Sequence, residues 1–151
     1  MAARLSLSRR NRLIRQLARA ERTLAGWSVA LARATSSDSG EAAAVASAHA
    51  MVHMISEARE SVRRRLAELD TTSPAAAQSY SEERLSGAVR FYLRRRSLAG
   101  LCLRACRCCG RALGRAFRVA ESVADLATAR VLYGDLRAFE KQLWVLDPRA
   151  A

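Results

Sequence analysis

The chain has 151 residues, half of them hydrophobic, which is enough for one helical core and argues against a second. Only seven Gly, two Pro and 5% aromatic residues, beside abundant Ala, Leu and Arg, count against a sheet-based fold. The net charge of +12 implies attraction to polyanions such as phospholipid headgroups, nucleic acid or acidic protein surfaces. We therefore expect one all-α domain over residues 1–151.

The positive charge is concentrated in two segments. Residues 1–35 carry eight arginines and one acid, and residues 71–118 carry ten arginines and two acids, whereas residues 36–70 and 119–151 are close to neutral. Every cation except Lys141 is an arginine, which can contact phosphate or carboxylate through two parallel hydrogen bonds. A GC-rich genome is the alternative explanation for this composition. If the two basic segments pack side by side, they would form one continuous basic face.

Residues 1–35 allow two interpretations. They are rich in Arg and Ser and contain no acid before Glu21, which is typical of a mitochondrial transit peptide. They also place apolar residues at alternating spacings of four and three, which predicts a bundle helix, and we favour this interpretation. The positions of that seam are Leu13, Leu17, Ala20, Leu24, Trp27 and Leu31.

A cluster of turn-forming residues at 36–40 predicts the first break, and Asp38 with Glu41 matches the spacing of a capping box. A second helix then runs to about Leu69, although Arg59 interrupts its seam for no reason visible in the sequence. The seam consists of Val45, Ala48, Val52, Ile55, Val62, Leu66 and Leu69. The longest uncharged runs have about 15 residues, which is too short to span a bilayer.

Residues 71–80, which include Pro74, predict the second break, and Ser79 with Glu82 marks the start of a third helix near Tyr80. This helix ends either at a glycine cap at Gly110 or at a turn near Gly100. In both cases a last helix is expected to continue without a break to Leu143 and to stop before Pro148. Short connections between these segments predict an antiparallel helical bundle of about four helices.

The stretch Leu98–Val119 is a basic amphipathic helix in this interpretation. At about 100° per residue, its five arginines fall on one narrow stripe and its cysteines and most apolar residues on the opposite half. The stripe consists of Arg104, Arg107, Arg111, Arg115 and Arg118. Gly110 and Gly114 have the small-residue spacing that lets two helices approach closely, which we interpret as packing relief.

All four cysteines lie in this stretch, with Cys102, Cys106 and Cys109 on one helical face and Cys108 at its edge. We expect them to be small buried hydrophobes, with palmitoylation or a metal site as the functional alternatives. Disulfides between such close positions on one helix are geometrically difficult. An intracellular, reducing compartment is therefore expected, with mitochondria as the alternative suggested by residues 1–35.

Catalytic signatures are not recognisable in the sequence. His49 and His53 share a helical face, but Ala50 stands where a zinc peptidase has its glutamate, so we expect ordinary surface or core histidines and no metal site. There is no Gly-rich phosphate loop and no nucleophile elbow. The sequence therefore predicts a protein without enzymatic activity and without a cofactor.

These observations predict a helical adaptor or scaffold that binds an anionic surface, in the first place a membrane surface that it contacts peripherally through its Arg-rich amphipathic helices. One alternative is a component of a ribonucleoprotein that contacts nucleic-acid phosphates. Another is a basic subunit of a larger protein assembly or oligomer with acidic partners. The candidate anion-binding residues are Arg9, Arg10, Arg12, Arg15, Arg94, Arg95, Arg96, Arg104, Arg107, Arg111, Arg115 and Arg118.

Overall fold

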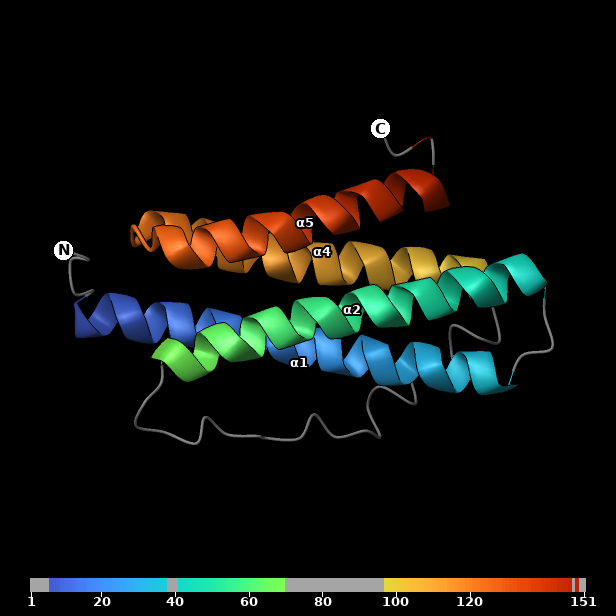
Figure 1. Ribbon diagram of the computed structural model, residues 1–151, viewed down its shortest axis with the longest axis horizontal. Coiled ribbons are helices and arrows are strands. Elements are labelled where there is room, and N and C mark those ends of the chain that lie inside the picture. Colours follow the sequence, from blue (N-terminus) through green and yellow to red (C-terminus); the bar gives the residue numbers. More distant parts are fainter. Residues whose placement is uncertain (1–5, 38–40, 70–96, 148, 150–151) are drawn as a thin grey trace.

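The computed structural model describes residues 6–37, 41–69, 97–147 and 149. Within these residues it contains helices only (Figure 1), which confirms the prediction of an all-α helical bundle. The helices are α1 (Leu7–Ser37), α2 (Ala42–Leu69), α4 (Leu98–Ser122) and α5 (Leu126–Leu146). None of the described helices is both long and apolar enough to cross a membrane.

The helices form two hairpins that pack against each other. Figure 1 shows α1 antiparallel to α2 and α4 antiparallel to α5, with α2 and α4 running in the same direction. Helix α1 packs against α2 and α4, and α2 also packs against α5, whereas α1 and α5 are not in contact in the described part of the chain. Helix α5 is therefore held by α4 on one side and by α2 on another.

The apolar seams predicted for the first two helices form much of the core. Leu13, Leu17, Leu24 and Leu31 of α1 are completely buried, and Trp27 packs against the core while half-buried. On α2 the completely buried seam positions include Ala48, Ile55 and Val62, while Val45, Val52 and Leu66 pack against the core from its edge. Both predicted seams are thus confirmed.

The arginine that interrupts the seam of α2 has a partner on the neighbouring helix. Arg59 donates a hydrogen bond from Nε to Oε1 of Glu21 on α1, at 2.7 Å. Glu21 is 19% exposed and Arg59 35% exposed, so the pair lies at the edge of the α1–α2 interface. A partner 38 residues away is invisible to any local sequence pattern.

The predicted break at Gly110 is wrong, because α4 continues through Gly110 and Gly114 to Ser122. The helix begins instead at Leu98, close to the alternative turn near Gly100, where the Ser97 side chain accepts a hydrogen bond from the amide of Gly100 at 3.3 Å. Contacts with neighbouring helices outweigh the weak helix propensity of the two glycines.

The prediction of one uninterrupted last helix is also wrong, because the chain turns sharply between α4 and α5. Ala124 adopts a left-handed conformation with φ of 59°, which is unusual for a residue other than glycine. Asp125 then caps α5 by accepting hydrogen bonds from the Thr128 amide at 3.1 Å and the Thr128 hydroxyl at 2.6 Å. These contacts fix the reversal without Gly or Pro.

Several predicted features lie outside the described residues. They are the capping box that begins at Asp38, the break at Pro74, the capping signal of Ser79 and Glu82, the third helix from Tyr80, and the arginines Arg94, Arg95 and Arg96.

Candidate functional site: an arginine-lined groove between α4 and α5

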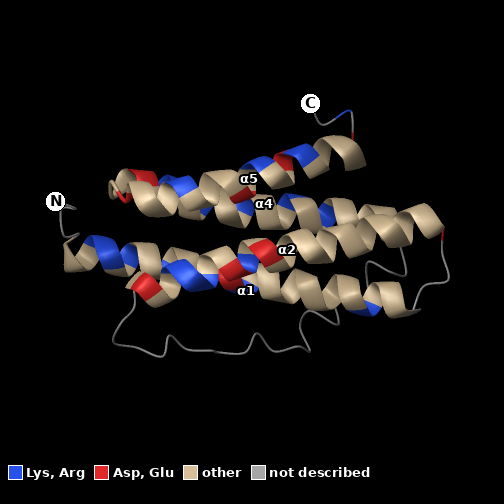
Figure 2. Ribbon diagram, in the orientation of Figure 1, with Lys and Arg blue, Asp and Glu red and all other residues tan. Residues whose placement is uncertain are grey.

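Helix α4 has a buried face and a basic face, as its sequence pattern predicts. Leu101, Ala105, Leu113 and Ala116 are at most 1% exposed, and they belong to the core of the bundle. All five arginines of the stripe are exposed. Figure 2 shows basic residues on α4 and along the first half of α1, whereas the first half of α2 carries none.

The arginines of the α4 stripe differ in their partners. Arg107 forms an ion pair with Asp147, beyond the end of α5, at 2.9 Å between Nη2 and Oδ2. Arg111, Arg115 and Arg118, by contrast, form no ion pair with any residue that the structure describes. Three adjacent guanidinium groups thus keep their hydrogen-bonding capacity for an external anion.

These three arginines line a groove between α4 and α5, which we call the α4–α5 groove. It consists of two adjoining open hollows of about 430 and 470 Å³ that share Arg111, Leu136 and Glu140. Arg115 and Arg118 line the first hollow from α4, and the apolar lining of the two hollows includes Phe117, Leu136, Phe139 and Leu143. The groove combines an apolar floor with a rim of arginines and one carboxylate, Glu140, which is paired with Arg137.

Gly110 and Gly114 of α4 lie in this groove. A Cβ atom added to Gly110 would meet Phe139 Cβ at 3.9 Å, and one added to Gly114 would meet Leu136 Cδ2 at 3.9 Å. Both distances are ordinary van der Waals contacts, so alanine would fit at either position. The packing relief that this small-residue spacing predicts therefore does not depend on glycine in particular. Each glycine costs the helix about 1 kcal/mol relative to alanine and leaves the groove open.

Two aromatic side chains line the first hollow of the groove beside the arginines. Phe117 is half-buried, Tyr133 is 54% exposed, and their ring centroids are 6.2 Å apart. Phe117 packs against the core from its edge, and sequence reasoning did not identify Tyr133. The sequence did contain a signal for the side of the groove that α5 forms. Tyr133, Arg137 and Glu140 are spaced four and three residues apart, which puts all three on one helical face.

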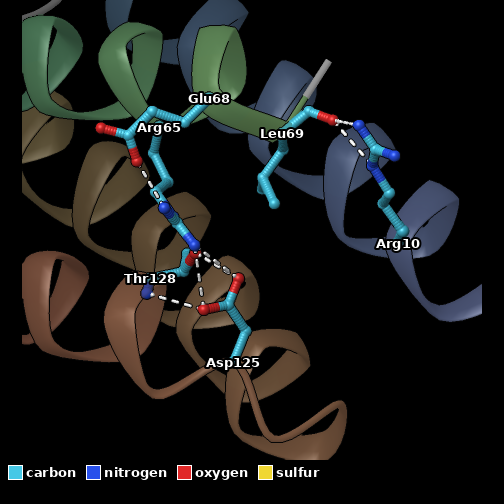
Figure 3. Close-up of polar contacts among 6 residues, drawn as sticks. All are labelled: Arg10, Arg65, Glu68, Leu69, Asp125 and Thr128. Atoms are coloured by element: carbon cyan, nitrogen blue, oxygen red, sulfur yellow. Dashed lines mark hydrogen bonds and ion pairs between the residues drawn. The ribbon is translucent and has the colours of Figure 1, made fainter. Parts of the chain in front are cut away.

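The predicted arginines of α1 line neither hollow of the groove. Arg9, Arg12 and Arg15 are exposed elsewhere on α1. Arg10 has a structural contact instead, because its guanidinium donates two hydrogen bonds to the carbonyl oxygen of Leu69, one of them from Nε at 2.7 Å (Figure 3). It thereby satisfies a carbonyl at the end of α2 that has no partner within the helix.

The cysteines lie mainly in the core. Cys102, Cys106 and Cys109 are buried, as predicted, and Cys106 donates a hydrogen bond from Sγ to the carbonyl oxygen of Phe139 at 3.4 Å. Burial raises the pKa of Cys102 and of Cys106 to about 11, and it also raises the pKa of Cys109. Because these three thiols are buried, their acylation would require the core to open. Cys108, by contrast, is half-buried.

No three His, Cys, Asp or Glu side chains in the described segments are arranged to hold a metal ion. His49 and His53 are both exposed. Nδ1 of His53 lies 3.7 Å from Oε2 of Glu57, one helical turn away.

On the other side of α5, a polar network joins α5 to α2 (Figure 3). Arg65 donates from Nη2 to both carboxylate oxygens of Asp125 at 3.1 Å and from Nε to the Thr128 hydroxyl at 2.6 Å, and its Nη1 contacts Glu68. Burial favours the neutral form of Asp125, but the hydrogen bonds from Thr128 and Arg65 outweigh it and lower the pKa of this carboxyl. Sequence reasoning did not identify this network.

A second carboxyl of α5, Asp135, has an opposite environment. Burial raises its pKa to about 6, and the nearby charge of Glu57 on α2 adds to the effect, while a hydrogen bond with Ser61 opposes it. Its Oδ2 atom is buried without a hydrogen-bond partner in the described part of the chain. At the α2–α5 interface, Asp125 thus has several hydrogen-bond partners, whereas one carboxylate oxygen of Asp135 has none among the described residues.

No family model matches this chain, and no significant match was found among curated proteins or solved structures.

Proposed function

We propose that the protein is a helical adaptor or scaffold without enzymatic activity, which associates peripherally with an anionic membrane surface through the arginines of α4. The observation that carries the proposal is the set of three exposed guanidinium groups, Arg111, Arg115 and Arg118, without ion-pair partners among the described residues. Each basic residue near an anionic bilayer contributes about 1 kcal/mol of attraction.

The packing of α4 specifies how such binding would work. Because the apolar face of α4 is part of the core, the helix would lie on the membrane with its arginines among the lipid headgroups and its apolar half still inside the bundle. Binding of this kind is mainly electrostatic and weakens with rising salt.

Vesicle flotation with the full chain tests the proposal. Wild-type protein is expected to float with phosphatidylglycerol-containing vesicles at low salt and to stay unbound with pure phosphatidylcholine. The triple substitution Arg111→Gln, Arg115→Gln and Arg118→Gln should weaken partitioning roughly 100-fold, because three contributions of about 1 kcal/mol are lost. Flotation that persists unchanged in this variant would overturn the proposal.

A charge-matched control separates a specific site from net charge. The variant Arg63→Gln, Arg64→Gln and Arg130→Gln removes the same charge from exposed positions of α2 and α5 that line neither hollow of the groove. It should lose clearly less binding than the α4 variant. Equal losses in the two variants would mean that only the total charge matters, and the assignment to α4 would be wrong.

Binding to the phosphate backbone of nucleic acid is the second candidate function. The exposed ring of Tyr133 favours it, because bases stack on such rings, and Tyr133 lies beside Phe117 and the arginines that have no ion-pair partner in the described part of the chain. Filter binding with mixed-sequence RNA, measured over a range of salt concentrations, distinguishes the two. Tight, salt-dependent RNA binding that is lost in Tyr133→Ala, together with absence of flotation, would favour this candidate.

A further inference from the structure

Resting on the proposed function, we propose that the α4–α5 groove binds a single anionic phospholipid. Its phosphate would lie among Arg111, Arg115 and Arg118, and one acyl chain would lie along the apolar floor. The proposal names a ligand class and a defined site, whereas electrostatic association with a bilayer requires neither.

The charge of the groove is complementary to an anionic headgroup. The three arginines of the rim have no carboxylate partner among the described residues, although Arg107 and Arg137 nearby do, with Asp147 and Glu140. A phosphate monoester or diester can accept several guanidinium hydrogen bonds at once. An uncharged ligand would leave these three positive charges without a counter-ion.

The apolar floor of the groove suits an acyl chain. From the arginines, the groove continues along α5 past Leu136, Phe139 and Leu143. An acyl chain on this floor would be removed from water, at a gain of about 0.8 kcal/mol for each buried CH₂ group. A free phosphate or a headgroup alone would not use this surface.

Gly110 and Gly114 shape the α4 side of the groove. Alanine would fit at both Gly110 and Gly114 without steric conflict, with its nearest contact at 3.9 Å. Glycine at these helix-interior positions therefore lowers helix stability without being required for packing. Its effect on shape is that the α4 wall of each hollow carries no side chain at these positions.

The test measures binding of a fluorescent lysophosphatidic acid, below its micelle concentration, to the full chain by anisotropy. Saturable binding of one molecule per chain is expected. Glycerol 3-phosphate, which carries the headgroup alone, and lysophosphatidylcholine, whose headgroup has no net charge, should each compete at least about tenfold more weakly than unlabelled lysophosphatidic acid. Equal competition by either compound would overturn the proposal.

Two matched substitutions test the location. Gly114→Leu fills the groove, whereas Gly134→Leu places the same side chain on a glycine of α5 that has no atom within 4 Å of an added Cβ and lines neither hollow. The first should weaken lysophosphatidic acid binding at least about tenfold and the second should leave it unchanged. Circular dichroism confirms that both variants fold. Wild-type affinity in Gly114→Leu would exclude the groove.

Flotation of the same variants separates this inference from the proposed function. If lysophosphatidic acid does not bind the groove but wild-type protein still floats with anionic vesicles, the lipid site is wrong and peripheral association remains. If both measurements fail, the membrane function is wrong as well.

Discussion

Helix α5 packs against α2 on one side and α4 on the other. The comparison of the two sides distinguishes charged residues that hold the fold together from charged residues that can bind a ligand. Toward α2, Asp125 is only 7% exposed and accepts hydrogen bonds from Arg65 and Thr128. Toward α4, three arginines have no carboxylate partner in the described residues, and two glycines leave a groove open. An arginine such as Arg65 belongs to the fold, whereas Arg111 is available to a ligand. Charge counting along the sequence cannot distinguish the two.

The largest expected effect is on the α2 side. Asp125→Ala removes the N-cap of α5 and leaves the guanidinium of Arg65, only 19% exposed, without its main partner. We expect the free energy of unfolding, measured by urea denaturation, to fall by about 2–3 kcal/mol. Asp147→Ala breaks the more exposed ion pair with Arg107 and should cost less than about 1 kcal/mol. Equal losses would contradict the proposed contrast.

On the α4 side, removing glycine should stabilise the protein. Gly110→Ala and Gly114→Ala should each raise the free energy of unfolding by up to about 1 kcal/mol, because alanine favours helix and fits in the groove. Gly134→Ala on the solvent side of α5 provides the reference gain. A loss of stability at Gly110 or Gly114, beside a gain at Gly134, would mean that helix packing does require these glycines.

A smaller effect is expected at Asp135, the poorly satisfied carboxyl on the α2 side. Asp135→Asn removes a charge that faces Glu57. Because the site is partly exposed and therefore screened, we expect a gain of about 0.5–1 kcal/mol in the free energy of unfolding at pH 7. The variant Glu57→Gln should give part of the same gain.

The same substitution should change the pH dependence of stability. In the folded protein Asp135 holds its proton up to about pH 6, whereas the ordinary pKa of an aspartate side chain is 3.8. Between these values the folded state binds more protons than the unfolded state, so stability falls as pH rises and is level above about 6. Asp125, whose pKa is lowered, acts oppositely, and its contribution is lost as pH falls below about 4. Urea denaturation from pH 4 to 7 should show a flatter profile for Asp135→Asn.

The smallest effect is expected for the arginines of the groove. Replacing Arg111, Arg115 and Arg118 with Gln should change the free energy of unfolding by less than about 0.5 kcal/mol, because no ion pair to a described residue is lost. Thermal denaturation measures this directly. A marked loss of stability would show that these arginines are structural, as Arg65 is, and would remove the main support for a binding role.

The helical seams could be predicted from the sequence because they depend on local periodicity. Leu13, Leu17 and Leu24 repeat at helical spacing, and burial follows from it. The reversal at Ala124 could not be predicted in this way, because apolar spacing continues from Phe117 into α5 and neither Gly nor Pro marks the turn. The one sequence signal for this turn was the spacing of Asp125 and Thr128, which fits a helix N-cap but is weak evidence on its own.

The candidate site was predictable in part. The stripe of arginines on α4 follows from helical geometry, and all five members are exposed. Their partners do not follow from it, because Asp147 lies 40 residues from Arg107 and Arg65 lies 60 residues from Asp125. The groove itself forms where α5 folds back and packs against α4. It could not be predicted, because the expected last helix had no break between these two segments.

The short corner at Val123–Asp125 also has a consequence for how the chain folds. The entropy lost in closing a loop increases with its length, and only the three residues Val123–Asp125 separate α4 from α5, so contacts within this hairpin form readily. The α1–α2 hairpin, joined by residues 38–41, has the same advantage. We therefore expect the two hairpins to form early and their association to limit the folding rate.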